Sequence, residues 1–456
     1  MMDKETRSHM LANEQIGRLL TILSVPAIIG MMVHALYNII DAVFVGRYTG
    51  TLGIGGVSIA FPLQLIFIST GVAIGTGGAS IISRRLGENN RSGASLALGN
   101  MFITSLLVGI TGLILGLIFR LPLLRLFGAT DALMPYAEAY FVIILLGAPL
   151  MTFPVAINAA ARAEGNTRVA MNSMVIGAIL NIIMDYLFIV RLGMGVKGAA
   201  LATVFSMGLS AIYILSYFMR GKSELSFKPA HMRPDLPTIR ETFAVGSSEL
   251  ARMAAGSLTF AVFNNILRSF GGEISIAAFG ILFRIMSFAF LPMVGIAQGV
   301  QPIMGFNYGA KMFSRVRKGL KLANVSSASV SLAGLICFSL FPCQVFGIFT
   351  TEKALIEIGS RGLTILALGL PLIGYQVVGI SLFQALGKSR PAFILSVMRQ
   401  VIFTIPLVFV LPPLLGLTGV WLAFPAGDVV AFMITVFMVR IAIRELPLSH
   451  NSQIRM

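Results

Sequence analysis

Twelve long apolar stretches, separated by short polar turns, occupy almost the whole chain and leave room for little else. A helix needs roughly 20 mainly apolar residues to cross a bilayer, and each stretch reaches that length. Only 11% of the residues are charged, whereas soluble domains carry about 25%, and the deficit runs along the entire chain. The sequence therefore predicts an all-α integral membrane protein with twelve transmembrane helices, at 16–45, 53–83, 94–119, 132–161, 169–190, 196–219, 239–267, 276–306, 319–342, 354–386, 391–411 and 417–440.

The distribution of basic residues indicates how these helices are oriented. If the N-terminus is cytoplasmic, the segments on the cytoplasmic side hold 23 Lys and Arg and the outer segments hold 7. Basic loops stay on the cytoplasmic side. We therefore expect a multi-pass protein of the prokaryotic (inner) membrane with both termini in the cytoplasm. The net charge of +16 then reflects topology and anionic lipid as a partner, not nucleic-acid binding.

The two halves of the chain repeat in an almost constant register. The motif Gly-x-Pro-Leu at 147–150 recurs at 369–372, and Ala-x-Gly-x-x-Arg at 163–168 recurs in the same register at 385–390. The first spans align with a small shift, which places Tyr-Asn at 37–38 on Phe-Asn at 263–264. So many matches in one register indicate an internal repeat rather than chance.

The repeat predicts the domain organisation. A polar, proline-containing cytoplasmic linker, 221–237, separates an N-terminal lobe, 1–220, from a C-terminal lobe, 238–456. Because each half has an even number of spans, we expect two pseudo-symmetric six-helix bundles with a central cleft, related by an axis along the membrane normal. Rocking of one bundle against the other would open that cleft to each side in turn, as in a secondary transporter.

Polar residues that occur in only one half are the strongest functional candidates, because a purely structural role should have been kept in both. From the spans of the first half we select Asp41, Asn158, Asn181 and Asp185 on this ground. The matched positions of the second half carry apolar residues, Leu267, Ile380, Phe403 and Leu407.

The two acids of this set suggest ion coupling. Tyr37 precedes Asp41 by four residues, and Asn181 precedes Asp185 by four, so each pair shares a helix face. An acid at the bilayer centre costs roughly 2.5–3.5 kcal/mol, which a wet cavity, a shared proton or a bound cation would offset. Asp41 and Asp185 suit either reversible protonation or Na⁺ binding. The alternative is that each acid hydrogen-bonds within its bundle and only stabilises packing.

Other intramembrane residues are weaker candidates. Pro26, in the middle of the first span, permits a kink that would bend the first bundle, or is an ordinary membrane-helix proline. Met286 and Gln298 on the eighth span could line an adaptable cavity, or make ordinary packing contacts. Glu249 and Arg252 are three residues apart on the seventh span and are expected to pair with each other.

The motifs give no support to enzymatic or ATP-driven chemistry. Gly387-Lys388-Ser389 resembles the end of a phosphate-binding loop, but that loop requires glycine where this chain has Leu382. Cys/His metal spacings and nucleophile motifs are absent from the sequence. We therefore expect no enzymatic activity, no use of ATP and no cofactor besides a coupling ion, H⁺ or Na⁺. An intramembrane enzyme is the alternative from another class, and it would need a catalytic pair that the sequence does not offer.

Several motifs carry a resemblance to a known family. They are Pro26, Tyr37-Asn38-x-x-Asp41 in span one, Asn181-x-x-x-Asp185 in span five, and Gly-x-Gln-Pro-x-x-Gly-Phe-Asn-Tyr-Gly-Ala at 299–310. Together they resemble the multidrug and toxic compound extrusion (MATE) family along nearly the whole chain, and within it the DinF/MepA-like branch. The resemblance implies an exporter of organic cations and lipophilic drugs by antiport with H⁺ or Na⁺. We expect the protein to be a monomer.

The resemblance also implies where the site lies. It assigns ion coupling to Asp41, Asn181, Asp185 and Thr203, with substrate contacts nearby at Tyr37, Asn38 and Asn158. Some members of the family carry acids in the second lobe as well, but span ten here reads Gly-Tyr-Gln at 374–376, without an acid. A lipid-linked oligosaccharide flippase of the same superfamily is the alternative. Such proteins line their cleft with basic residues, and four arginines lie within the spans of the second half of this chain, away from the span ends: Arg252, Arg284, Arg361 and Arg399.

Overall fold

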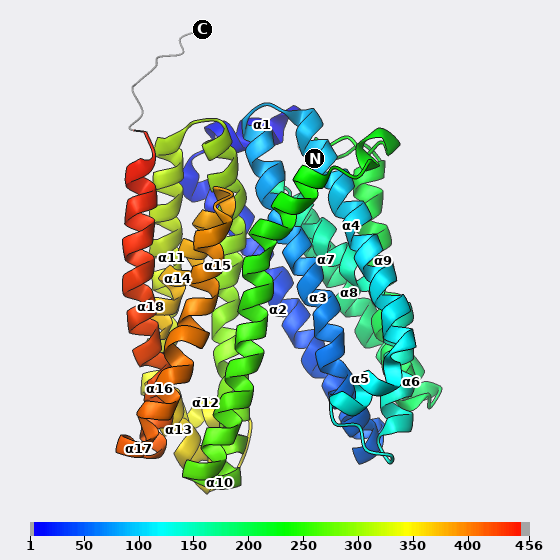
Figure 1. Ribbon diagram of the computed structural model, residues 1–456, viewed down its shortest axis with the longest axis vertical. Coiled ribbons are helices and arrows are strands. Elements are labelled where there is room, and N and C mark those ends of the chain that lie inside the picture. Colours follow the sequence, from blue (N-terminus) through cyan, green and yellow to red (C-terminus); the bar gives the residue numbers. More distant parts are fainter. Residues whose placement is uncertain (1–3, 448–456) are drawn as a thin grey trace. The chain divides into compact units, whose positions relative to one another are not determined.

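The computed structural model describes residues 4–447, and Figure 1 shows that these residues form helices joined by short turns. Contacts divide the chain into two compact units. Residues 4–13 and 29–246 form the unit called here the first bundle, and residues 14–28 and 247–447 form the second bundle. The lobe boundaries set from the sequence stay a prediction. So does the cytoplasmic placement of the two chain ends, which lie outside the described residues.

The first bundle begins with a short helix before its membrane spans. Its helices are α1 (Lys4–Asn13), α2 (Ile16–Tyr48), α3 (Gly50–Gly87), α4 (Arg91–Ile118), α5 (Arg120–Leu126), α6 (Met134–Leu146), α7 (Ala148–Ala163), α8 (Thr167–Asp185), the π-helix η1 (Tyr186–Arg191), α9 (Gly195–Met219) and the 3₁₀ turn η2 (Pro229–Met232). Asparagine caps start two of them: the side chains of Asn90 and Asn166 accept hydrogen bonds from the backbone N–H groups of Gly93 and Val169. The helix α2 contributes residues 29–48 to this bundle and residues 16–28 to the other.

The second bundle contains α10 (Leu236–Gly309) from residue 247 onward, the preceding residues of this helix belonging to the first bundle. Its other helices are α11 (Phe313–Leu340), α12 (Pro342–Gly347), α13 (Lys353–Ala367), α14 (Leu370–Ala385), α15 (Ser389–Val397), the π-helix η3 (Met398–Thr404), α16 (Ile405–Val410), α17 (Pro412–Leu415) and α18 (Leu417–Glu445). Gly272 interrupts α10 with φ 63° and ψ −165°, a backbone conformation open to glycine but not to other residues. The element α10 is therefore two helices joined at this glycine, in agreement with the two spans predicted at 239–267 and 276–306.

The helices give twelve membrane spans. Nine helices of the described chain are long and apolar enough to cross a bilayer by themselves. The bent pairs α6–α7 and α13–α14 supply one further span each, and the division of α10 at Gly272 supplies the twelfth. The prediction of an all-α membrane protein with twelve transmembrane helices is confirmed.

Two of the predicted spans are broken rather than continuous. The segment predicted at 132–161 bends by 53° at Gly147, and the segment predicted at 354–386 bends by 50° between Ala367 and Leu370. In each case a proline, Pro149 or Pro371, lies in the first turn of the second helix. Backbone N–H groups in the first turn have no intrahelical acceptor, so the lack of an N–H in proline costs no hydrogen bond there. The repeat thus copies the bend as well as the spans.

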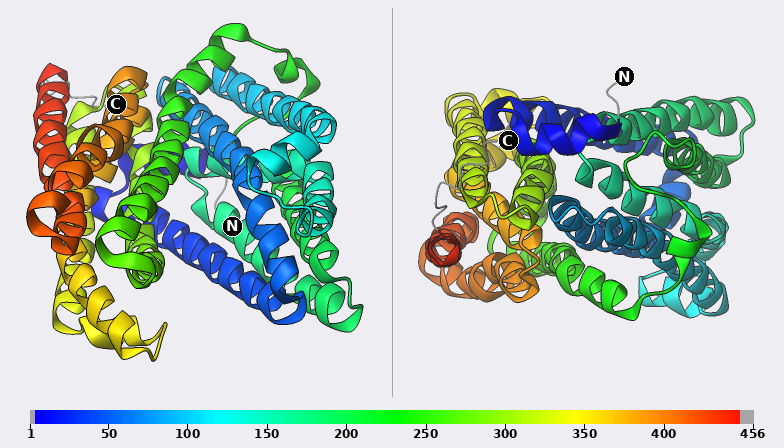
Figure 2. Two further views of the ribbon diagram at one scale, coloured as in Figure 1. Left: turned by 60° about the horizontal axis from the view of Figure 1, so that its bottom comes forward. Right: turned by 90° about the horizontal axis from the view of Figure 1, so that it is seen from above.

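Each bundle has its own apolar core. In the first bundle Phe67, Phe141 and Ile144 belong to one buried cluster. In the second, the ring of Phe263 packs on that of Phe424 with centroids 4.2 Å apart, beside Phe279. In the view from above in Figure 2, α18, drawn in red, is seen nearly end-on.

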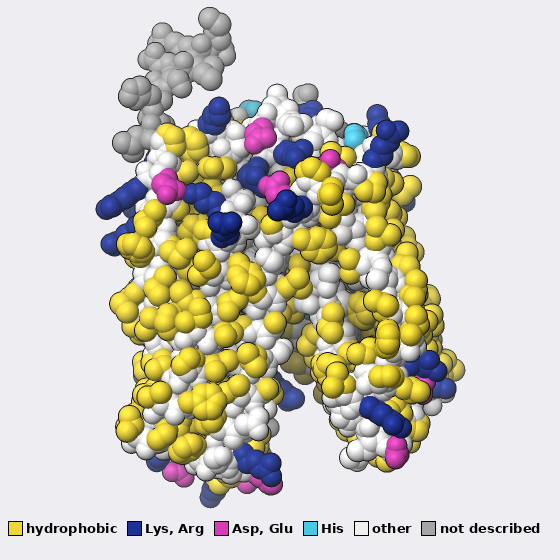
Figure 3. Space-filling model, viewed as in Figure 1, with side chains coloured by type: hydrophobic (Ala, Val, Ile, Leu, Met, Phe, Trp, Pro, Cys, Tyr) yellow, Lys and Arg dark blue, Asp and Glu magenta, His cyan; other side chains and the backbone are white. Residues whose placement is uncertain are grey.

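Hydrophobic side chains also cover the outside of each bundle. Figure 3 shows them as a broad band on both bundles, with Lys and Arg gathered toward the ends of the helices. Large apolar side chains such as Leu107, Ile212 and Phe437 are more than half exposed. A band of this kind is what lipid requires, and the chain is a multi-pass membrane protein.

Candidate functional site

The first part of the candidate site comes from α2. Tyr37 is buried, and the ring of His34 lies edge-on to its ring, with centroids 4.8 Å apart. One turn further on, Oδ1 of Asp41 is buried and has no hydrogen-bond partner among the described residues. Asn38 differs from both, because its side chain is exposed and its amide donates to the carbonyl of His34 at 2.7 Å. Of the predicted residues on this helix, Tyr37 and Asp41 share the buried face.

The second part comes from the end of α8. Asn181 and Asp185 are 1% and 0% exposed. All four polar atoms of their side chains are buried without a hydrogen-bond partner among the residues that the structure describes. Directly after Asp185 the backbone changes from α-helix to the π-helix η1, a rare geometry that is frequent at functional sites.

The structure brings these two parts together. The carboxyl groups of Asp41 and Asp185 interact directly, yet no hydrogen bond of ordinary geometry satisfies Asp185 or Oδ1 of Asp41. Tyr37 lies within electrostatic range of both acids. The helices α2 and α8 thus place two carboxyl groups from distant parts of the sequence at one buried point of the first bundle.

Two residues that were not predicted from the sequence, Tyr140 and Gln64, also belong to the candidate site. Tyr140 on α6 lies within electrostatic range of Asp41, Asp185 and Tyr37, and its hydroxyl donates to Oε1 of Gln64 on α3 at 3.0 Å. The repeat could have revealed both. In the register that places 147–150 on 369–372, Tyr140 is matched by a glycine, Gly362, and Gln64 by a methionine, Met286.

The remaining predicted residues of the first bundle are buried but less directly connected. Asn158 on α7 donates to Oγ of Ser173 on α8 at 3.4 Å, while its Oδ1 is buried without a described partner. Ser173 in turn exchanges hydrogen bonds with Ser210 on α9. Thr203, 5% exposed, lies on α9, which packs against α8. Asn158 therefore belongs to a polar network that joins three helices.

Two acids within spans of the second bundle, Glu249 and Asp428, have partners, in contrast to Asp41 and Asp185. Glu249 accepts two hydrogen bonds from Arg252, at 2.9 and 2.7 Å, and a third from Gln384 at 2.9 Å. The predicted pairing of Glu249 with Arg252 is confirmed. Asp428 on α18 pairs with Arg399 at 3.3 Å. Within the described chain, unsatisfied buried carboxyl groups are a feature of the first bundle.

Three predicted residues lie on other parts of the helices. Met286 packs against the cluster that contains Phe279 and also against the one around Met293. Gln298 is half-buried on the same helix. Pro26 is buried within α2, which continues through it as one helix. It stands two residues before the point where α2 passes from the second bundle to the first.

The donor set of the acidic pair fits a proton or Na⁺. Hard cations prefer oxygen ligands, and Asp41, Asn181 and Asp185 all present buried oxygens that have no partner among the described residues. The described residues contain no cluster of three or more His, Cys, Asp and Glu side chains. A cation here would therefore be held by a mixture of carboxylate and amide oxygens.

The fold and this site define a polytopic membrane protein built from two repeated helical bundles. The chain belongs to the MatE family, whose model matches residues 26–187 and 250–410. It is 26% identical over 420 residues to the multidrug export protein MepA of Staphylococcus saprophyticus, which covers 91% of this chain and 92% of that protein.

Solved structures of MATE proteins are similar to this chain over nearly its whole length. A multidrug resistance MATE family transporter of the MOP superfamily in an outward-facing conformation has a TM-score of 0.91 and 27% identity, covering 98% of this chain and 100% of the other. A MATE protein in its bent conformation also has a TM-score of 0.91 and 27% identity, covering 96% and 98%.

Proposed function

We propose that this protein is a secondary active exporter of organic cations and lipophilic drugs, driven by antiport with H⁺ or Na⁺. Membership of the MatE family and the likeness to MepA over nine-tenths of the chain support the class of cargo. The ion would bind at Asp41 and Asp185. The two bundles would expose a cleft between them to each side of the membrane in turn.

One observation carries the coupling assignment: the carboxyl groups of Asp41 and Asp185 interact with each other, while Oδ1 of Asp41 and both oxygens of Asp185 are buried without a hydrogen-bond partner among the described residues. Two negative charges at this point would repel each other in a medium of low dielectric constant. A proton or Na⁺ removes that repulsion. A pair that served packing alone would be expected to have hydrogen-bond partners, as Glu249 and Asp428 do.

Coupling then follows from competition. An organic cation and the driving ion would both be attracted to the same pair of acids, so binding of one would favour release of the other. Tyr37 and Tyr140 would supply aromatic surface and hydroxyl groups beside the acids. Pro26 would let α2 bend as the bundle changes state.

Efflux from proteoliposomes tests the proposal, with a pH gradient and a Na⁺ gradient imposed separately. We expect a fluorescent organic cation to be exported under one gradient, and Asp41→Asn to abolish that export while the protein still folds. Competition should come from other drugs and not from lipid-linked oligosaccharides, which the alternative flippase would carry. Wild-type export by Asp41→Asn would exclude this coupling site.

A further inference from the structure

The second bundle has polar residues of its own that the first bundle does not copy. In the register that aligns the first span of each half, Arg252 is matched by Pro26. Arg399 and Gln400 are matched by a glycine and an alanine, at positions 177 and 178. A role in the shared scaffold does not account for two arginines and an amide that occur in one bundle only.

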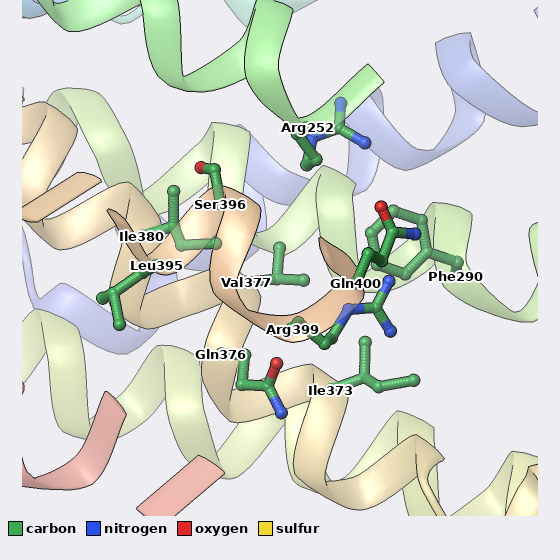
Figure 4. A pocket seen from close by; sticks show the side chains of 10 residues that line it. All are labelled: Arg252, Phe290, Ile373, Gln376, Val377, Ile380, Leu395, Ser396, Arg399 and Gln400. Atoms are coloured by element: carbon green, nitrogen blue, oxygen red, sulfur yellow. The ribbon is translucent and has the colours of Figure 1, made fainter. Parts of the chain in front are cut away.

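These three residues line one small cavity inside the second bundle (Figure 4). Arg252 comes from α10, and Arg399 and Gln400 come from the π-helix η3. In the close-up the amide of Gln400 lies between the two guanidinium groups. The cavity volume of about 20 Å³ is enough for one occupant of about the size of a water molecule.

The charges at this cavity are arranged asymmetrically. The acidic partners of the two arginines, Glu249 and Asp428, are not among the residues that line it. The lining therefore contains two permanent cations and no carboxylate. Each guanidinium is ion-paired with its carboxylate, Glu249 or Asp428, so an occupant of the cavity would meet the N–H donors of two ion pairs, and such donors favour a hydrogen-bond acceptor such as an anion.

The two arginines that line the cavity also have N–H donors that their ion pairs do not use. Arg252 uses Nε and Nη2 on Glu249, and Arg399 uses Nη1 on Asp428. A guanidinium has five N–H donors, so each arginine keeps several that no described residue accepts. Oε1 of Gln400 is buried without a described partner, and a flip of the amide, which exchanges its oxygen and nitrogen, would present the N–H₂ group instead.

We propose that this cavity binds a small monatomic anion, with chloride as the physiological occupant. Chloride accepts several N–H donors at once and is close enough to water in size for the cavity. The unused guanidinium donors of Arg252 and Arg399 would bind it from two helices, and the Gln400 amide would complete its shell. The anion would join α10 to η3 and stabilise the second bundle, whether or not the first bundle couples ions.

Thermal unfolding of the full-length purified protein tests this proposal. The single tryptophan, Trp421, is buried in the second bundle, so its fluorescence reports on the unfolding of this bundle. Chloride is titrated against gluconate at constant sodium concentration. We expect a saturable rise in the unfolding temperature with chloride, reproduced by bromide and absent with gluconate.

Two variants of one residue make the test specific. Gln400→Glu places a carboxylate in the cavity and should abolish the chloride-dependent rise. Gln400→Met removes the amide without adding charge and should raise the half-saturating chloride concentration about tenfold, as expected for the loss of one hydrogen bond to a charged group. Gln344→Glu, the same change at an exposed position of α12, should leave the chloride effect intact.

Equal unfolding temperatures of the wild-type protein in chloride and gluconate would overturn the proposal and leave water as the occupant. A full chloride effect in Gln400→Glu would overturn it too. So would stabilisation by acetate in the absence of any effect of bromide, since the site would then recognise carboxylates. Bromide located by anomalous scattering between Arg252 and Arg399 would support the proposal directly.

Discussion

Asn181 and Asp185 stand one helical turn apart on α8, and none of their four polar side-chain atoms has a hydrogen-bond partner among the described residues. Such groups are costly to bury, and native proteins leave few of them unsatisfied. The concentration of this cost at one point, beside Asp41, suggests that an exchangeable ion supplies the missing contacts.

Replacement of Asp185 by leucine, the residue at the matched position 407, should separate function from stability. The variant removes a buried, unsatisfied carboxyl group. We therefore expect an unfolding temperature equal to or above that of the wild-type protein, together with the loss of ion-driven efflux. Asp131→Asn, a change at a fully exposed acid, is the control and should affect neither quantity. Retained efflux in Asp185→Leu would show that the acid has no part in coupling.

Tyr140→Phe tests whether the residues found only in the structure belong to the site. The change removes the hydroxyl that donates to Gln64 and keeps the ring, so the free energy of unfolding should fall by about 1 kcal/mol. Efflux should also weaken, because the hydroxyl lies within electrostatic range of both acids. Gln64→Met should reproduce the loss of stability, and the double variant should cost little more than either change alone. Additive losses would mean that the two side chains act independently.

Glu249→Gln tests whether coupling is confined to the first bundle. Arg252 would lose an ionised partner, so the protein should be less stable, by about 1–3 kcal/mol for this partly buried pair. Efflux driven by the ion gradient should continue. The double variant Glu249→Gln/Arg252→Gln should recover part of the stability, since no charge is left unpaired. If Glu249→Gln stops efflux in a folded protein, the second bundle takes part in coupling after all.

The twelve spans could be predicted from the sequence because each crossing of a bilayer requires about 20 mainly apolar residues, and stretches of that length are visible in the sequence itself. The bends at Gly147 and near Gly369 were not predicted, although the same Gly-x-Pro motif marks both. A proline is compatible with a continuous membrane helix, as Pro26 in α2 demonstrates, so the motif alone does not reveal a break.

For a similar reason, only part of the candidate site could be predicted from the sequence. Comparison of the halves selected Asp41, Asn181 and Asp185, but it gave no means of placing α2 beside α8. Tyr140 and Gln64 carry the same repeat signal, yet tyrosine and glutamine in a span are less unusual than an acid. Tyr140 comes within electrostatic range of the acids, and Gln64 within reach of Tyr140, only through the packing of α3 and α6, which is tertiary information.

Glu164 lies at the end of α7 and is 0% exposed. Its carboxylate accepts hydrogen bonds from Arg7 on α1, from the Tyr217 hydroxyl on α9, and from Ser223 at 2.6 Å. Glu164→Ala should lower the free energy of unfolding by about 3–5 kcal/mol, because Arg7 would keep a largely buried charge without an anion. It should also expose the segment after α1 to proteolysis.

Glu224→Ala is the matched control for that variant. Glu224 is only partly buried and accepts hydrogen bonds from Ser8 alone among the contacts with α1, so its loss should cost about 1 kcal/mol and leave α1 in place. Thermal unfolding and limited proteolysis of both variants measure the difference. Equal effects would mean that α1 is held by its apolar contacts rather than by the buried carboxylate of Glu164.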